Sequence, residues 1–146
     1  MNTRDCFKEG LLRTTTPSPE MAQKEMDNSS KYLADAKRCL QEGMPEMAVV
    51  AVYTSMFHAS RALLFRDGIR ERSHICVIAY LVEYYSGLKP HIRTLDIYRR
   101  SRHMMLYGVD VSAVTEDARQ GILAAGQFQK AVETELAKPL PSGPGK

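Results

Sequence analysis

The sequence predicts an all-α protein, an antiparallel up-and-down bundle of four long helices plus one shorter helix. Apolar residues recur at spacings of three and four over five segments, and Gly, Pro or Ser residues mark the ends of these segments. No segment alternates between apolar and polar residues over a useful length, so no strand is expected. With short connections, successive helices should run antiparallel, and 146 residues suit a single domain.

The bundle is expected to span residues 18–137, between a loosely held arm at 1–17 and a disordered tail at 138–146 that is rich in Pro and Gly. Ser18-Pro19-Glu20 has the pattern of a helix start, in which Ser caps free N–H groups and Pro occupies the first helical position. This first helix should end at residue 41 or 42, because Gly43 can adopt the left-handed conformation that ends helices.

The second predicted helix begins at Pro45 and ends near Asp67-Gly68. It is apolar over a wide arc and includes a strip of small residues, which favours a central position approached closely by other helices. The remaining helices are expected at 73–85, 90–107 and 112–137. Ser73 should cap the first of these, with Ile75, Ile78, Val82 and Tyr85 on one side, and Gly108 should end the second.

Cysteine usage favours free thiols. Cys6, Cys39 and Cys76 are odd in number and widely spaced, and no CxxC pair is present, so neither a zinc site nor a disulfide is expected. The four histidines are also too far apart to suggest a metal site, and no cofactor is expected. No run reaches the roughly 20 apolar residues of a membrane span. We therefore expect no membrane association and a cytoplasmic location.

Positive charge is concentrated in the middle of the chain. The segment from Arg61 to Arg102 carries a net charge of +5, and the rest of the chain carries −2. Such a local excess suits an anionic partner. The other interpretation, a set of solvated helix faces, stays open at this point.

The fourth predicted helix interrupts its own apolar pattern. Ile92, Leu95, Arg99, Arg102 and Leu106 share one stripe, with two arginines at its centre. A guanidinium stays charged, so burial of these groups would require a carboxylate, phosphate or carbonyl partner. The stripe therefore indicates either a polar cleft with an anion or arginines that reach water along their aliphatic stems.

The central segment resembles the signature of the HEPN family. The run AVYTSMFHASRALLF at 51–65 is followed by Gly68-Ile69 and then by Ser73-His74, and the segment from Arg102 to Gly108 is similar to the family's Arg-containing fourth helix. This resemblance extends over roughly residues 5–137. It implies a bundle of four long helices and a shorter one that commonly forms a homodimer.

The resemblance also implies a function. Many HEPN proteins are metal-independent endoribonucleases, often toxins paired with a small nucleotidyltransferase antitoxin, with an Arg-polar…His motif in a dimer cleft. Metal-free RNA cleavage requires a base, an acid and a cation for the phosphorane, which His and Arg can supply. By similarity the catalytic candidates are Arg102, His103 and Tyr107, where Tyr107 stands at the position expected for His and is a poor base at neutral pH.

Arg99, His58 and His74 are the candidates for binding phosphate or a nucleotide. His58 and His74 belong to the signature segments, although His58 on an apolar helix also suits a core histidine held by a hydrogen bond. Three functions stay open at this point. The protein could be an RNA-directed member of a toxin–antitoxin-like pair, a non-catalytic module that binds a nucleotide or a nucleotidyltransferase, or a dimer whose arginines form only salt bridges.

Overall fold

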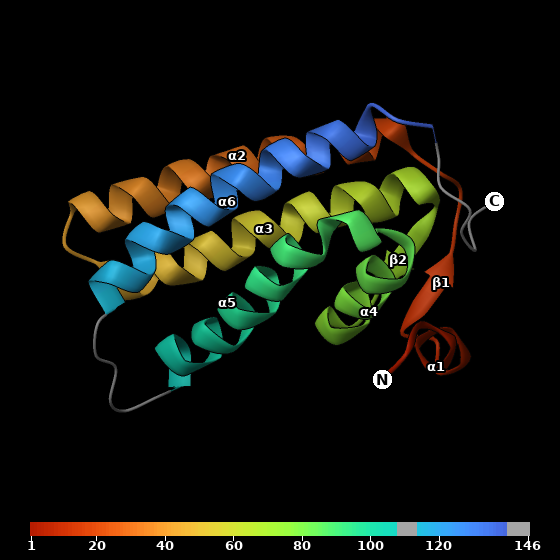
Figure 1. Cartoon of the computed structure of the whole chain (residues 1–146), viewed down its shortest axis with the longest axis horizontal. Coiled ribbons are helices and arrows are strands. Elements are labelled where there is room, and N and C mark those ends of the chain that lie inside the picture. Colours follow the sequence, from red (N-terminus) through yellow and green to blue (C-terminus); the bar gives the residue numbers. More distant parts are fainter. Residues whose placement is uncertain (108–113, 140–146) are drawn as a thin grey trace.

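The computed structural model describes residues 1–107 and 114–139 and confirms the predicted all-α class (Figure 1). The elements in chain order are α1 (Thr3–Lys8), β1 (Leu12–Thr14), α2 (Pro19–Gln41), α3 (Pro45–Asp67), β2 (Ile69–Glu71), α4 (His74–Tyr84), the short 3-10 helix η1 (Ser86–Leu88), α5 (Lys89–Tyr107) and α6 (Val114–Leu136). Helices α2 and α6 cover one side of α3, and α4 and α5 lie on its other side (Figure 1).

The predicted helix ends are confirmed where the structure describes them. The Ser18 hydroxyl accepts a hydrogen bond from the Met21 N–H at 3.1 Å, as expected of an N-cap. Gly68 ends α3 with a φ of +78°, and a Cβ there would lie 2.6 Å from the Thr15 carbonyl oxygen, so only glycine fits. The predictions for Gly108, Ser112 and the tail from residue 140 lie outside the described residues.

Helix α3 is the central helix of the bundle, as its sequence predicts. Its large apolar side chains are fully buried: Val49, Val52, Met56, Leu63 and Leu64. By length and mean hydropathy α3 could also cross a membrane, contrary to the expectation from its sequence, yet 61% of its most apolar window is buried inside the bundle. A core helix meets the same criteria.

The buried side of α4 differs from the side that the apolar pattern suggested. Ile75 and Val82 are about half exposed, at 50% each, while Val77, Tyr80 and Leu81 face the core. Both faces of this short helix are apolar, so periodicity could not identify the inner one. The outer face of α4 therefore exposes apolar surface at Ile75 and Val82.

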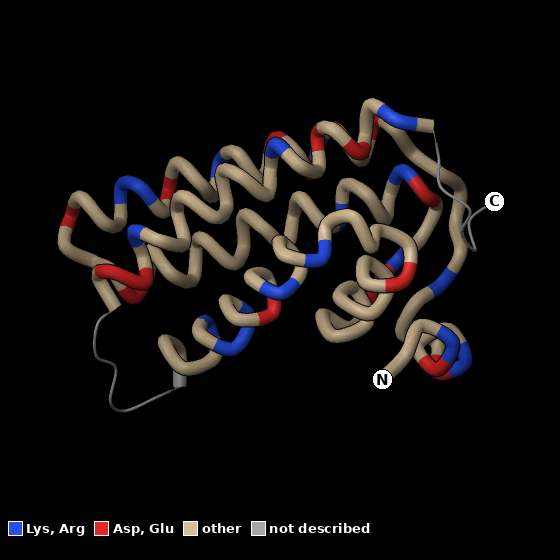
Figure 2. The backbone as a smooth tube through the Cα atoms, in the orientation of Figure 1, with Lys and Arg blue, Asp and Glu red and all other residues tan. Residues whose placement is uncertain are grey.

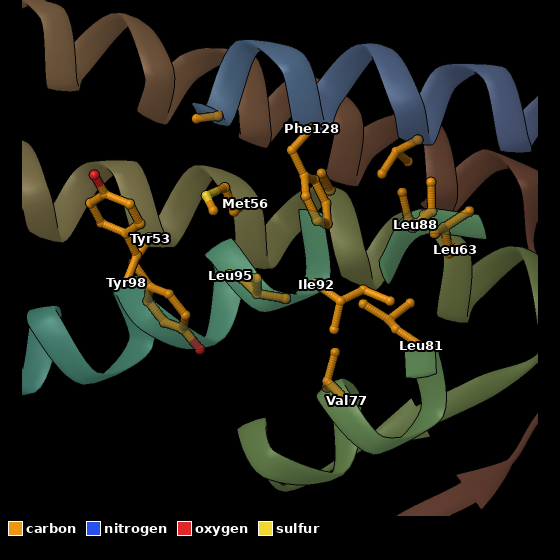
Figure 3. Close-up of a cluster of buried hydrophobic side chains, with 14 of the residues drawn as sticks. Tyr53, Met56, Leu63, Val77, Leu81, Leu88, Ile92, Leu95, Tyr98 and Phe128 are labelled. Carbon is orange, nitrogen blue, oxygen red and sulfur yellow. The ribbon is translucent and has the colours of Figure 1, made fainter. Parts of the chain in front are cut away.

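The buried row of side chains on α5 also differs from the predicted stripe. Leu88, Ile92, Leu95 and Tyr98 are buried, and Figure 3 shows Ile92 below Phe128 of α6 and Tyr98 further along α5. Tyr98 continues the buried row in place of Arg99, because its hydroxyl donates to the Asp117 carbonyl oxygen at 2.7 Å and its ring occupies the space beside Gly121. Leu106 is exposed, and Arg99 and Arg102 lie at the edge of the core.

The N-terminal segment is not a loose arm. Residues 3–8 form α1, and β1 pairs antiparallel with β2, an element that the sequence did not predict. A disulfide joins Cys6 to Cys76 on α4, so the expectation of three free thiols was wrong; Cys39 is free and half-buried. Both pairings join residues more than 50 positions apart, and no local sequence signal indicates such contacts.

A buried polar network holds the ends of three helices together around Asp67. The hydroxyls of Tyr80 and Tyr85 donate to its Oδ2 at 2.9 and 2.6 Å. The Arg66 guanidinium lies 3.4 Å from Oδ1, donates to the Tyr85 hydroxyl, and reaches the Glu135 carbonyl oxygen at the end of α6. Because each charge has partners, the network is satisfied in spite of its burial.

We expect Asp67→Asn to lower the free energy of unfolding by roughly 3 kcal/mol, because the amide NH2 would face donors in either orientation, the two hydroxyls or Arg66, and the Arg66 charge would lose its carboxylate. Chemical denaturation measures this change. The matched control is Asp27→Asn on the exposed face of α2, which should change stability by less than about 0.5 kcal/mol. Equal effects of the two substitutions would contradict the assigned role of the network.

Candidate functional site

Three helices bring the signature segment and the arginine stripe together. We call this group the His74 site: it comprises Tyr53 and Phe57 of α3, His74 at the start of α4, and Arg99 and Arg102 of α5. Tyr53 and Phe57 lie one turn apart on the side of α3 that faces α4 and α5. The Ser73 hydroxyl accepts from the Cys76 N–H and fixes the first turn of α4, which sets the position of His74.

His74 is held by two contacts with α3. Its Nδ1 lies 2.6 Å from the Tyr53 hydroxyl oxygen, and its ring stacks on Phe57 with centroids 4.0 Å apart. The imidazole is therefore fixed in position, although His74 is exposed at its outer edge. Turning the ring over would break the hydrogen bond, and tilting it would break the stacking.

The environment keeps both partners of this hydrogen bond neutral. Burial, followed by the positive charges of Arg102, Arg99 and Arg61, lowers the pKa of His74 below its ordinary value. Burial raises the pKa of Tyr53 to about 12, against the opposing effect of the two α5 arginines. Tyr53 is buried, and Nδ1 of His74 is the acceptor that the described residues offer to its hydroxyl, so the hydroxyl donates to Nδ1. A neutral imidazole that accepts at Nδ1 carries its single proton on Nε2.

The two arginines of the stripe have different partners. Arg99 donates from Nε to the Asp96 carboxylate at 3.0 Å, and Arg100 shares that carboxylate at 2.9 Å. The Arg102 guanidinium lies 5.8 Å from the centroid of the Tyr53 ring and forms no ion pair with any residue in 1–107 or 114–139. One carboxylate therefore serves two guanidiniums, and positive charge remains in excess at the site.

His58 belongs to a different network, one residue further along α3. Its Nδ1 lies 2.5 Å from the carboxylate of Glu25, and its ring stacks on Tyr32. Arg61 connects the same carboxylate to Glu71 of β2, at 3.5 and 2.7 Å. An anion would be repelled by Glu25 here, so the structure favours the interpretation of His58 as a histidine held by a hydrogen bond.

The remaining candidates lie near the end of α5. His103 follows Arg102 and is exposed. Tyr107 is the last residue of α5, and its side chain lies outside the described part of the structure. Within the described residues, no group of three His, Cys, Asp or Glu side chains could hold a metal ion.

Tyr53 and Phe57 were not recognised as site residues from the sequence, and neither was the effect of the Arg61 charge on His74. All three lie at four-residue spacing in the signature segment, so a stripe on one face of α3 was available as a signal. The sequence could not indicate that this stripe meets His74, because that contact depends on how α4 packs against α3.

We expect Arg102→Gln to raise the pKa of His74, because it removes a nearby positive charge that disfavours the imidazolium. An NMR pH titration of the His74 ring measures the change, and Arg93→Gln, an exposed position earlier on α5, should leave it unaltered. Since the pKa is lower in the folded than in the unfolded protein, His74 should reduce stability as the pH falls below about 6.5. An unchanged titration in Arg102→Gln would contradict the proximity of the two groups.

Comparison with known proteins agrees with the resemblance of the central segment. A search of curated proteins finds no match to this chain. The family model of the HEPN domain matches residues 22–135, which include α3, α4 and α5 and therefore the whole His74 site. The chain belongs to the HEPN family.

Proposed function

We propose that this HEPN-family protein is RNA-directed and binds a backbone phosphate of RNA at the His74 site. The observation that carries the proposal is the Arg102 guanidinium, which has no carboxylate partner among the described residues and lies beside a neutral histidine that presents N–H outward. Arg99 adds further positive charge, because it shares the Asp96 carboxylate with Arg100.

The chemistry of these groups suits a phosphodiester. Guanidiniums present several N–H donors in a planar arrangement that matches phosphate oxygens, and the Nε2–H of His74 supplies one more. Because Nδ1 accepts from Tyr53 and Nε2 already carries the proton, neutral His74 has no free basic nitrogen. His74 would therefore bind substrate in this state and would not deprotonate a 2′-hydroxyl.

Metal-independent RNA cleavage is the second candidate function, and the exposed imidazole of His103 next to Arg102 is the observation that favours it. In that mechanism His103 would transfer protons while Arg102 stabilises the charge on the phosphorane. The protein would then act as the toxin of a toxin–antitoxin-like pair, with a nucleotidyltransferase as its antitoxin.

We expect Arg102→Gln to weaken binding of a short single-stranded RNA about tenfold or more, because it removes a charge-assisted contact with phosphate. Fluorescence anisotropy at fixed salt measures the affinity. Binding by the wild type should also tighten as the pH falls through the titration of His74, since the imidazolium adds a positive charge. Arg93→Gln serves as the control with the same loss of charge on the same helix.

The same RNA distinguishes binding from cleavage. After incubation with the protein in EDTA, RNA that is bound but stays intact would assign a binding function, and fragments that disappear in His103→Gln would assign cleavage to His103. If neither the wild type nor any variant bound or cut RNA, the proposed function would be wrong.

A second copy of the chain is the partner that the surface of α4 and α5 supports best. Four large apolar side chains on these helices are about half exposed: Ile75, Val82, Ile97 and Met104. A groove of about 680 Å³ runs along α4 and is lined by Ile78 and Arg99 among others, so it adjoins the His74 site. A homodimer through these faces would cover the apolar side chains and bring two sites close together.

We expect Ile97→Glu to weaken self-association about tenfold or more, because a two-fold interface would bury two new carboxylates. Light scattering across a concentration series measures this. Leu123→Glu, on the exposed side of α6 and 63% exposed in the native chain, should have no effect. A wild type that stays monomeric at all concentrations, or equal effects of both substitutions, would contradict this interface.

A further inference from the structure

The outer face of the β1–β2 ribbon carries three arginines. The register pairs Arg13 with Arg70 directly, and Arg72 lies two residues beyond Arg70 on the same face. Leu12 and Ile69 are buried beneath the ribbon, whereas the three arginines are exposed. Together with Glu71 they line a concavity of about 350 Å³.

The positive charge of this face is not neutralised within the described chain. None of the three arginines forms an ion pair with another described residue. The one carboxylate of the concavity, that of Glu71, accepts a 2.7 Å hydrogen bond from Nε of Arg61. Like charges directly opposite each other on two strands destabilise their pairing, so a bound anion would relieve a cost already present in the fold.

The ribbon leads directly into the His74 site. Arg72 directly follows β2, Ser73 caps α4, and His74 is the next residue. Arg61 links the two regions, because it binds Glu71 of β2 and its charge also acts on the His74 imidazole. Figure 2 shows basic positions on β1 and along α5, which lie on opposite sides of α4.

We propose that Arg13, Arg70 and Arg72 form a second phosphate-binding site, which holds the backbone of an RNA strand whose adjoining nucleotide occupies the His74 site. This inference rests on the proposed function. Two groups of cations joined by a short stretch of chain suit a polyanion better than a mononucleotide, because each further phosphate releases counterions when it meets a fixed positive charge.

Two single-stranded RNAs test the proposal, one of about 4 nucleotides that can occupy the His74 site alone and one of about 12 that can reach both sites. The test variant is Arg13→Gln/Arg70→Gln/Arg72→Gln. The control with the same loss of charge is Lys37→Gln/Arg119→Gln/Lys130→Gln, three exposed cations of α2 and α6. Fluorescence anisotropy over a salt series gives the affinity and its salt dependence for each combination of protein and RNA.

The arginine variant should bind the longer RNA about tenfold or more weakly, and its slope of log affinity against log salt should fall by about 2, as expected for three lost phosphate contacts. Binding of the shorter RNA should be unchanged. The proposal is overturned if the control variant loses as much affinity, if the shorter RNA is affected equally, or if the longer RNA binds as before.

Loss of binding in Arg102→Gln with no effect of the ribbon variant would remove the ribbon site and leave the proposed function in place. If the triple variant fails to melt cooperatively, Arg72→Gln alone provides the test, with Lys37→Gln as its control. A single substitution should reduce the salt slope by about 0.7 for the longer RNA only.

Discussion

The enclosure of α3 by α2, α5 and α6 is the constraint on which the rest of the structure depends. A helix buried on so many sides must give each of its polar side chains a partner, because an unsatisfied buried group costs about 1–3 kcal/mol. Ser55 exchanges hydrogen bonds with Ser29 of α2, and Asp67 binds two tyrosine hydroxyls. The same requirement places Tyr53 against His74, so the packing of the core also positions the site.

The charge distribution of the site depends on which of the α5 arginines can reach the Asp96 carboxylate. Asp96 lies three residues before Arg99 and four before Arg100, within reach of both on one helix face. Arg102 lies beyond that reach, and its guanidinium is placed over the Tyr53 ring. Burial and this excess positive charge both lower the pKa of His74 and favour the neutral imidazole, and the hydrogen bond from Tyr53 to Nδ1 leaves the proton on Nε2, where it can only be donated.

The sequence predicted the features that depend on local patterns. Ser18, Gly43 and Gly68 marked helix ends through capping and left-handed geometry, and the apolar residues of α3 indicated its central position. Prediction from the sequence failed where burial depended on packing between distant segments. The inner side of α4 could not be identified because both sides are apolar, and Tyr98 displaced Arg99 from the buried row through a contact with Gly121 of α6.

The candidate site was predicted only in part, because its residues were visible in the sequence but their contacts depend on packing between distant segments. Arg99, Arg102 and His74 were identified by residue type and by resemblance, and the structure brings them together. His58 was grouped with them because it shares the signature segment, but its Nδ1 is bound to Glu25. The partner of an ionisable side chain, which decides its chemistry, is set by tertiary contacts that no spacing along the chain encodes.

The N-terminal segment gives the site a component that the family match does not include. The match begins at residue 22, yet the preceding residues are attached on both sides of the β2–α4 junction. The Cys6–Cys76 disulfide holds α1 to α4, β1 pairs with β2, and the Thr15 N–H donates to the Gly68 carbonyl oxygen at 2.8 Å. These contacts fix the strand that carries Arg70 and leads to His74, and they add Arg13 beside it. The positions of the ribbon arginines thus depend on the N-terminal segment, which local sequence patterns predicted to be a loose arm. The disulfide attaches this segment to α4 covalently, so the placement of Arg13 beside Arg70 is part of the fold.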